Sequence, residues 1–169
     1  MDDQDLVVAP ATAEQAEFVD RLLYEAGAWL AARGIHQWSS VWPPSAHEQR
    51  ETRERIAQGC CYLAWRGGAA VGTLALLPAD ETLWGQDRGD ALYVHGLAIS
   101  RAAAGQGLGL ALLRWAEREA LARGRRLLRL DCMGPNLALR AYYRRAGFAE
   151  RGTVVEDSGW EATLLEKQL

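Results

Sequence analysis

The chain has 169 residues, of which 49% are hydrophobic and 24% are charged, and its formal net charge is −3 at pH 7. This composition is typical of one globular domain and excludes a disordered chain, while the small negative charge argues against a nucleic-acid or membrane partner. No apolar run reaches the roughly 20 residues that span a bilayer, and the chain starts acidic rather than cationic. Cys60, Cys61 and Cys132 do not form the spaced Cys/His pairs of a zinc site. We therefore expect a cytoplasmic protein without a metal.

The first third of the chain predicts one short strand and two helices. Residues 6–9 are apolar and are followed by a proline, as expected for an opening strand. A helix is predicted from an N-cap at Thr12, with apolar residues at helical spacing as far as Gly34. The aromatic-rich stretch Ile35–Pro44 then predicts a loop, and Ser45–Gln58 predicts a charged helix.

Strands dominate the middle of the chain. Cys61–Arg66 and Ala69–Leu77 flank Gly67-Gly68, which is a strong signal for a hairpin. A polar loop that contains Trp84 follows. The apolar run Ala91–Ile99 is then long enough for a central strand.

The last third alternates helices and strands. The expected elements are a helix from Gly105–Gly109 to about Arg123, a strand over Leu127–Cys132, a helix with Pro135 in its first turn that ends before Gly147, and strands over Phe148–Val155 and Trp160–Glu166. Strand–helix–strand order implies a parallel pair, whereas the flanking hairpins imply antiparallel pairing. The predicted fold class is therefore α/β (α+β mixed), with a mostly antiparallel central sheet of about six or seven strands and helices on both faces.

The most informative segment is the glycine-rich turn Ala104-Gly105-Gln106-Gly107-Leu108-Gly109, which follows a strand and opens a helix. Glycines let the backbone approach a ligand, and the first turn of a helix offers unpaired N–H groups to a phosphate. A Walker A loop is excluded because no Gly-Lys-Ser/Thr occurs here, and the dinucleotide fingerprint is excluded because the glycines alternate. A tight turn without a ligand is the alternative interpretation.

A second unusual segment runs from Asn136 to Phe148. On a helix Asn136 and Tyr143 share a face, because seven residues make two turns, and together they can line a cleft. Taken alone, the segment is better explained by Asn136 as a helix cap and by Tyr142 and Tyr143 as packing residues.

Together, the two segments resemble the GNAT superfamily of acyl-CoA N-acyltransferases, over about residues 60–150. The family's phosphate motif, Arg/Gln-x-x-Gly-x-Gly/Ala, is matched by residues 104–109 except that Ala104 replaces the usual Arg or Gln. Arg101 is a candidate source of the missing charge. The family's Asn…Tyr…Gly-Phe pattern is matched by Asn136, Tyr143, Gly147 and Phe148.

The resemblance implies one GNAT-like domain over residues 1–169, whose parallel strand pair splays at the cofactor cleft. It also implies an N-acetyltransferase that uses acetyl-CoA as cosubstrate. In that reaction a primary amine of a small molecule, or of a peptide or protein, attacks the thioester directly in a ternary complex. Acetyl-CoA or CoA and the amine are the expected partners, and homodimers are common among relatives.

Roles for individual residues follow from the same resemblance. Backbone groups of the central strand at Leu97, Ala98 and Ile99 are expected to hold the pantetheine arm and the thioester oxygen. Backbone amides of Ala104, Gly105, Gln106, Gly107, Leu108 and Gly109 are expected to hold the pyrophosphate. Asn136 is expected to contact the pantetheine, and Tyr143 to protonate the departing sulfur.

The catalytic base is predicted to be His95. It lies on the same predicted strand face as Tyr93, Leu97 and Ile99, and histidine is the residue type suited to proton removal near neutral pH. It also matches a strand histidine of serotonin-acetylating members, whereas Tyr93 stands where histone-acetylating members have a glutamate. A hydrogen-bonded core histidine and a base made of ordered waters are the alternatives.

The acceptor wall is predicted from regions that form it in relatives, which hold Trp29, Gln37, Trp38, Trp42 and Trp84, and Tyr93 is a further substrate-binding candidate. The favoured alternative is a second hydrophobic cluster. Asp131 is buried by pattern, so we expect it to form a salt link to an arginine. Cys132 beside it is expected to be a small buried hydrophobe.

Two other functions remain open from the sequence. One is a catalytically silent acyl-CoA-binding sensor of the same fold, against which the presence of Tyr143 argues weakly. The other is a nucleotide- or phosphate-binding protein that uses the same turn. A missing P-loop lysine and a missing ribose-binding acid argue against it.

Overall fold

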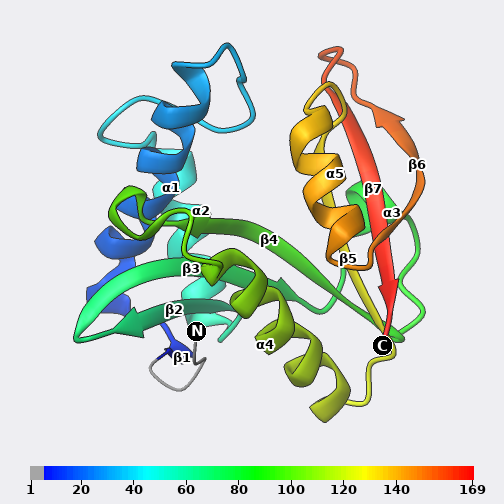
Figure 1. Ribbon diagram of the computed structural model, residues 1–169, viewed down its shortest axis with the longest axis horizontal. Helices are drawn as coiled ribbons and strands as arrows, with labels where there is room; N and C mark the ends of the chain where they lie inside the picture. The colour runs from blue at the N-terminus through cyan, green and yellow to red at the C-terminus, as the bar shows by residue number, and fades with distance from the viewer. Residues whose placement is uncertain (1–5) are drawn as a thin grey trace. The chain divides into compact units, whose positions relative to one another are not determined.

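The computed structural model describes residues 6–169 of the chain. They form two compact units: the first is the chain up to Leu76 with Gly96–Trp115, and the second is Leu77–His95 with Ala116–Leu169. In chain order the elements are β1 (Val7–Pro10), η2 (Ala13–Gln15), α1 (Ala16–Ala31), α2 (Ala46–Ala57), β2 (Cys61–Arg66), β3 (Ala69–Leu77), α3 (Glu81–Trp84), β4 (Ala91–Ile99), η3 (Arg101–Ala103), α4 (Leu108–Ala122), β5 (Leu127–Met133), α5 (Leu137–Arg145), β6 (Ala149–Val155) and β7 (Glu161–Gln168), as labelled in Figure 1.

The seven strands have the order β1-β2-β3-β4-β5-β7-β6. Pairing is antiparallel for β1 with β2, β2 with β3, β5 with β7 and β7 with β6. The pair β4 and β5 is parallel, with a ladder from Ala91↔Leu127 to Val94↔Leu130, although β4 extends to Ile99 and β5 to Met133. The predicted mixed, mostly antiparallel sheet with one parallel pair is therefore confirmed.

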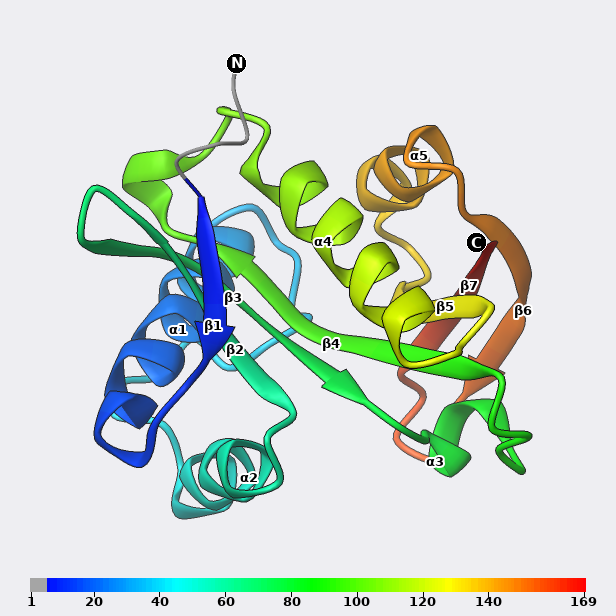
Figure 2. The ribbon, with the colours of Figure 1, turned by 90° about the horizontal axis from the view of Figure 1, so that it is seen from below.

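In the first unit, helices cover both faces of the strands. Ala11, which follows β1, and residues of α1, α2 and β2 form one core cluster, which consists of Ala11, Ala16, Val19, Leu22, Ile56, Cys61 and Leu63. Tyr62 lies between the last two on β2 and faces the other way, because side chains alternate along a strand. Its ring packs against Trp115 of α4, with ring centroids 4.8 Å apart. Figure 2 shows α2 and the first half of α4 on opposite sides of the strands.

In the second unit, β5 separates an apolar face from a polar one. Leu128, Leu130 and Cys132 are at most 2% exposed, whereas the alternating residues Arg129 and Asp131 face the other side. Helix α5 runs beside β5 and β7 (Figure 1), and its Tyr143 packs edge-on against Phe148 with ring centroids 5.9 Å apart. Polar residues of this unit therefore gather on one face of the parallel pair.

The structure differs from the predicted elements in three places. Part of the expected polar loop is the short helix α3, because the Asp80 carboxylate accepts a hydrogen bond from the N–H of Leu83 at 3.2 Å. Helix α5 starts after an N-cap at Asn136, so Pro135 lies outside the helix rather than in its first turn. Gly96 has φ +57° within β4, a left-handed conformation that a regular strand residue does not adopt.

Among the described residues, no helix combines the length and the apolar character that crossing a bilayer demands.

Candidate functional site

The glycine-rich turn takes a backbone conformation that only glycine adopts readily. Gly105 has φ +76° and Gly107 has φ +77°, both in the left-handed region. Helix α4 starts directly afterwards, and its first hydrogen bond joins the N–H of Ala111 to the carbonyl of Gly107 at 3.1 Å. No heavy atom lies within 4 Å of a Cβ built at either glycine. The turn therefore presents uncovered backbone in front of a helix N-terminus, an arrangement that can bind phosphate.

Two contacts within the first unit hold the segment that runs from the end of β4 to this turn. The N–H of Ser100, at the end of β4, donates to the carbonyl of Val71 at 2.9 Å. The guanidinium of Arg66, at the end of β2, donates to the side-chain oxygen of Gln106. Arg66 thus brings a positive charge to the turn in which Ala104 replaces the family's Arg or Gln. Sequence reasoning missed Arg66, because 40 residues separate it from Gln106.

Arg101, the sequence candidate for the missing charge, is stacked on an aromatic ring. Its guanidinium carbon lies 4.2 Å from the ring centroid of Trp29, and that of Arg33 lies 3.8 Å from the same centroid. Two guanidinium groups thus occupy positions over the indole of Trp29. Because both are cationic, they disfavour a cationic amine at this ring.

The end of β4 in the first unit is closely packed. Ala98 is 4% exposed, and a Cβ at Gly72 of β3 would lie 3.1 Å from the Ala98 carbonyl oxygen and 2.9 Å from Cδ1 of Ile99. Leu97 and Ile99 are partly buried. The backbone roles of Leu97, Ala98 and Ile99 toward a pantetheine arm stay predictions.

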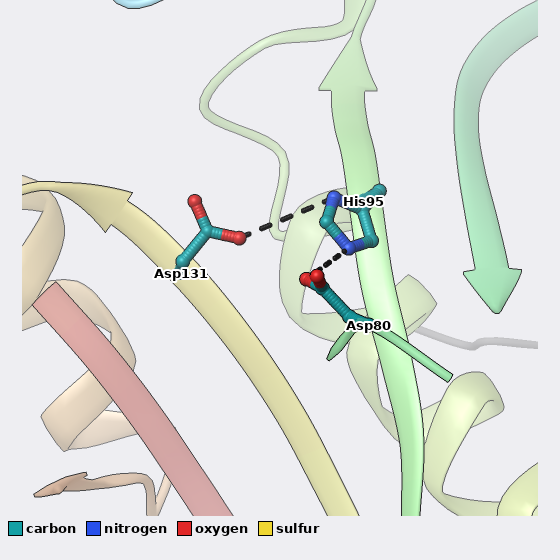
Figure 3. A group of neighbouring side chains, drawn as sticks. All are labelled: Asp80, His95 and Asp131. Carbon is teal, nitrogen blue, oxygen red and sulfur yellow. Dashed lines mark hydrogen bonds and ion pairs between the residues drawn. The ribbon is translucent and has the colours of Figure 1, made fainter. Parts of the chain in front are cut away.

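In the second unit, His95 lies between two aspartates (Figure 3). Its Nε2 is 3.0 Å from Oδ2 of Asp80, and its Nδ1 is 4.0 Å from Oδ1 of Asp131. The three side chains are 9–21% exposed, and their ligand-type atoms lie within 4.8 Å of one another. His95 follows the last ladder pair of β4 and Asp131 follows that of β5, so the group sits where the parallel ladder ends.

Asp131 corrects one prediction. The ion partner that the described residues give it is His95 and not an arginine. Burial raises the pKa of the Asp131 carboxyl, and the neighbouring charge of Asp80 acts in the same direction, whereas His95 opposes both. Asp80 was missed as a site residue, although an aspartate directly before Glu81-Thr82-Leu83-Trp84 is a recognisable N-cap signal.

In the second predicted motif, Asn136 caps a helix and Tyr143 is a buried phenol. Oδ1 of Asn136 accepts a hydrogen bond from the N–H of Leu139 at 3.1 Å, which makes Asn136 the N-cap of α5. Tyr143 is 7% exposed, and within residues 6–169 its hydroxyl forms no hydrogen bond. The pKa of Tyr143 is raised, mainly by burial, so the phenol stays protonated near neutral pH.

Cys132 is 0% exposed and burial raises its pKa to about 11. It is therefore the small buried residue that was expected and not a thiolate nucleophile.

The predicted acceptor-wall residues fall in different units. Trp29, Gln37 and Trp38 belong to the first unit, in which the buried Oε1 of Gln37 has no hydrogen-bond partner among the described residues. Trp84 and Tyr93 belong to the second, and their ring centroids are 6.2 Å apart. The Tyr93 hydroxyl is already engaged: it accepts from Arg129 at 2.9 Å and donates to Asp87 at 3.2 Å.

Known proteins are similar to this chain in sequence and in fold. A family model described as "Acetyltransferase (GNAT) family" matches residues 27–148. The chain is 35% identical over 165 residues to the N-acetyltransferase YesJ of Bacillus subtilis (strain 168), an alignment that covers 95% of this chain and 88% of YesJ. A GNAT-family acetyltransferase from Listeria monocytogenes 4b F2365 has a similar structure, with a TM-score of 0.78, 26% identity and coverage of 97% of this chain and 95% of that chain. The structure of yncA from Salmonella typhimurium with acetyl-CoA gives a TM-score of 0.67 at 16% identity, with 97% and 94% coverage. This chain belongs to the GNAT family of acetyltransferases.

Proposed function

We propose that this protein transfers the acetyl group of acetyl-CoA to a primary amine of a small molecule. The glycine turn before α4 carries the proposal, because Gly105 and Gly107 have positive φ angles and a Cβ built at either would meet no atom within 4 Å beyond its chain neighbours. Only a requirement for this backbone shape explains two such glycines around Gln106. A diphosphate fits the exposed N–H groups and the helix N-terminus that the shape creates.

Acetyl-CoA is the diphosphate carrier that the family points to, since the yncA structure of the same fold was determined with it. In this chain the backbone from Ala104 to Gly109 would bind the pyrophosphate, with Arg66 adding positive charge at Gln106. Asn136 uses Oδ1 for the helix cap, which leaves its Nδ2 as the donor for a pantetheine carbonyl.

The second unit supplies the groups that acid–base chemistry requires. His95 is the base that takes a proton from the acceptor's ammonium group, which frees the nitrogen lone pair. The amine then forms the C–N bond while the C–S bond breaks and its electron pair leaves on sulfur. Tyr143 protonates that thiolate, and the second proton lost by the nitrogen restores the phenol. Over one turnover, an ammonium and acetyl-CoA give an amide, CoA thiol and one proton.

Thermal unfolding with different ligands tests the cosubstrate. Acetyl-CoA and CoA at 100 times their Kd should each stabilise the protein by about 2.7 kcal/mol, whereas ATP and NAD at equal concentration should have little effect. Equal stabilisation by all four, or by none, would contradict the assignment.

Release of free thiol, followed with a chromogenic disulfide over a panel of primary amines, tests the reaction and names the acceptor. Binding of CoA without thiol release over the whole panel favours the silent sensor. A matched panel of tertiary amines is the control, because a tertiary nitrogen cannot form a stable amide.

A further inference from the structure

The imidazole of His95 is flanked by a different carboxylate at each ring nitrogen. Asp80 faces Nε2 at hydrogen-bond distance, 3.0 Å, whereas Asp131 faces Nδ1 at 4.0 Å, beyond the range of a direct hydrogen bond. Figure 3 shows the ring between the two aspartates, with Asp131 approaching from β5. The two sides of the ring are therefore chemically different.

Asp80 is held in place independently of His95. Its Oδ1 accepts from the N–H of Leu83 at 3.2 Å as the N-cap of α3, while its Oδ2 faces the imidazole. An ionised carboxylate only accepts hydrogen bonds, so the 3.0 Å contact requires the proton on Nε2. The neutral imidazole then carries its lone pair on Nδ1. Asp80 thus selects the tautomer in which the basic nitrogen points toward Asp131.

Nδ1 and Asp131 together lack a positively charged donor. The carboxylate of Asp131 is 15% exposed and is 4.0 Å from a nitrogen that carries a lone pair, so neither group satisfies the other. The Asp131 carboxylate accepts a backbone hydrogen bond from its own residue, but burial still disfavours its charge, and an ammonium group would stabilise that charge further. An alkylammonium has three N–H donors, which suffice for Nδ1 and Asp131 at once. One ligand-type atom from each of Asp80, His95 and Asp131 lies within 4.8 Å of the others, so a divalent cation is the competing occupant that the test below includes.

We propose that Nδ1 of His95 and the carboxylate of Asp131 bind the ammonium group of the acceptor, and that Asp80 is the residue that positions His95 for this. The inference rests on the proposed acetyl transfer and narrows the acceptor to amines that carry a charge at neutral pH. One ammonium proton moves to Nδ1, its N–H bond electrons stay on the amine nitrogen as the attacking lone pair, and the resulting imidazolium lies between two carboxylates.

The tautomer is measured directly by long-range ¹H–¹⁵N NMR of the imidazole rings, without any substrate. The chain has 3 histidines, so the His95 signals are those missing from His95→Gln. The wild type should show the Nε2–H tautomer when neutral. In Asp80→Asn the amide still caps α3 through its oxygen but can no longer accept from Nε2–H if its NH₂ faces the ring, so Nδ1–H should appear. A wild-type ring protonated on Nδ1, or an unchanged tautomer in Asp80→Asn, would overturn the positioning role.

Ammonium binding is tested by titrating methylammonium chloride and following the His95 Nδ1 resonance. Tetramethylammonium is the matched control, because it has the same charge but no N–H donor. A saturable shift with methylammonium alone, weakened at least tenfold in Asp131→Asn, is expected from the loss of one charge-assisted hydrogen bond. Equal responses to both cations, no response, or a response that persists in Asp131→Asn would refute the subsite, as would a saturable shift with zinc chloride at lower concentration.

These measurements do not depend on turnover. A protein that binds methylammonium as described but releases no thiol from acetyl-CoA would refute the acetyl transfer and leave the subsite intact. If Asp131→Asn turned over alkylamines as fast as the wild type, the subsite would be refuted and the acetyl transfer would stand.

Discussion

The hydroxyl of Thr52 in α2 donates a hydrogen bond of 2.6 Å to the carboxylate of Asp20 in α1. Both residues are 7% exposed, so this contact joins the two helices inside the core of the first unit. Burial raises the pKa of Asp20, and the Thr52 hydrogen bond opposes that rise. The Thr52–Asp20 hydrogen bond therefore stabilises the folded protein only when both side chains are present.

Replacing Thr52 by Val should destabilise the protein by about 1.5–3 kcal/mol, because it leaves a buried carboxylate without its hydroxyl donor. Urea unfolding measures the change. In the Asp20→Asn background the same Thr52→Val change should cost less, since no charge is left to desolvate. Equal losses in the two backgrounds would show that the carboxylate is not the cause.

The pH dependence of stability should reveal the raised pKa of Asp20. The folded protein holds the Asp20 proton at pH values where the unfolded chain, with a pKa of 3.8, has lost it. This contribution to stability is therefore fully present below pH 3.8 and is lost as pH rises through the folded pKa. Compared with Asp20→Asn, the wild type should lose stability as the pH rises above 3.8. A difference that is flat or of opposite sign would contradict the shift.

The fold was predictable from local patterns because its signals are short-range. The Gly67-Gly68 hairpin, the alternating strand over Leu127–Cys132 and the glycines before α4 each specify their own backbone. Helix α3 was missed because four residues give no helical period, and only its cap at Asp80 marks it.

The candidate site was predictable only where one segment carries it. The glycine turn and His95 stand out in the sequence, but their partners come from distant strands: Arg66 reaches Gln106, and Asp131 reaches His95. Charge on a strand residue indicates that it needs a partner but not which one. The expectation of an arginine beside Asp131 failed for this reason.

Replacing Gly107 by Ala should weaken CoA binding at least tenfold. A side chain at φ +77° costs about 1–2 kcal/mol, and the turn would relax away from the shape that presents its N–H groups. Gly124→Ala is the matched control, because Gly124 has φ +70° with no atom within 4 Å of a built Cβ but ends α4 rather than starting it. Calorimetry should show weaker CoA binding in the first variant alone. Similar affinity in both variants would remove the turn from the cosubstrate site.

Replacing Tyr143 by Phe should lower kcat by about 10²-fold or more while the KM for acetyl-CoA stays nearly constant, because the ring remains and only the proton donor is lost. Stability should not fall, since the hydroxyl makes no hydrogen bond within residues 6–169. Tyr142→Phe is the control, and its ring lies 5.5 Å from that of Tyr143. Equal losses of kcat in both variants would assign the effect to packing.

Replacing Gly27 by Ala should destabilise the protein, although alanine normally favours a helix over glycine by about 1 kcal/mol. A Cβ at this position of α1 would overlap the backbone carbonyl oxygen of Ser39 and lie 3.4 Å from the Cβ of Trp38. A backbone oxygen cannot rotate away as a side chain can, so the loop that carries Gln37 and Trp38 must move. We expect a loss of about 1–3 kcal/mol in urea unfolding, with a change in tryptophan fluorescence. A gain in the free energy of unfolding close to the helix-propensity value would contradict this prediction. It would show that the loop moves at no cost, and that Gly27 does not hold it against α1.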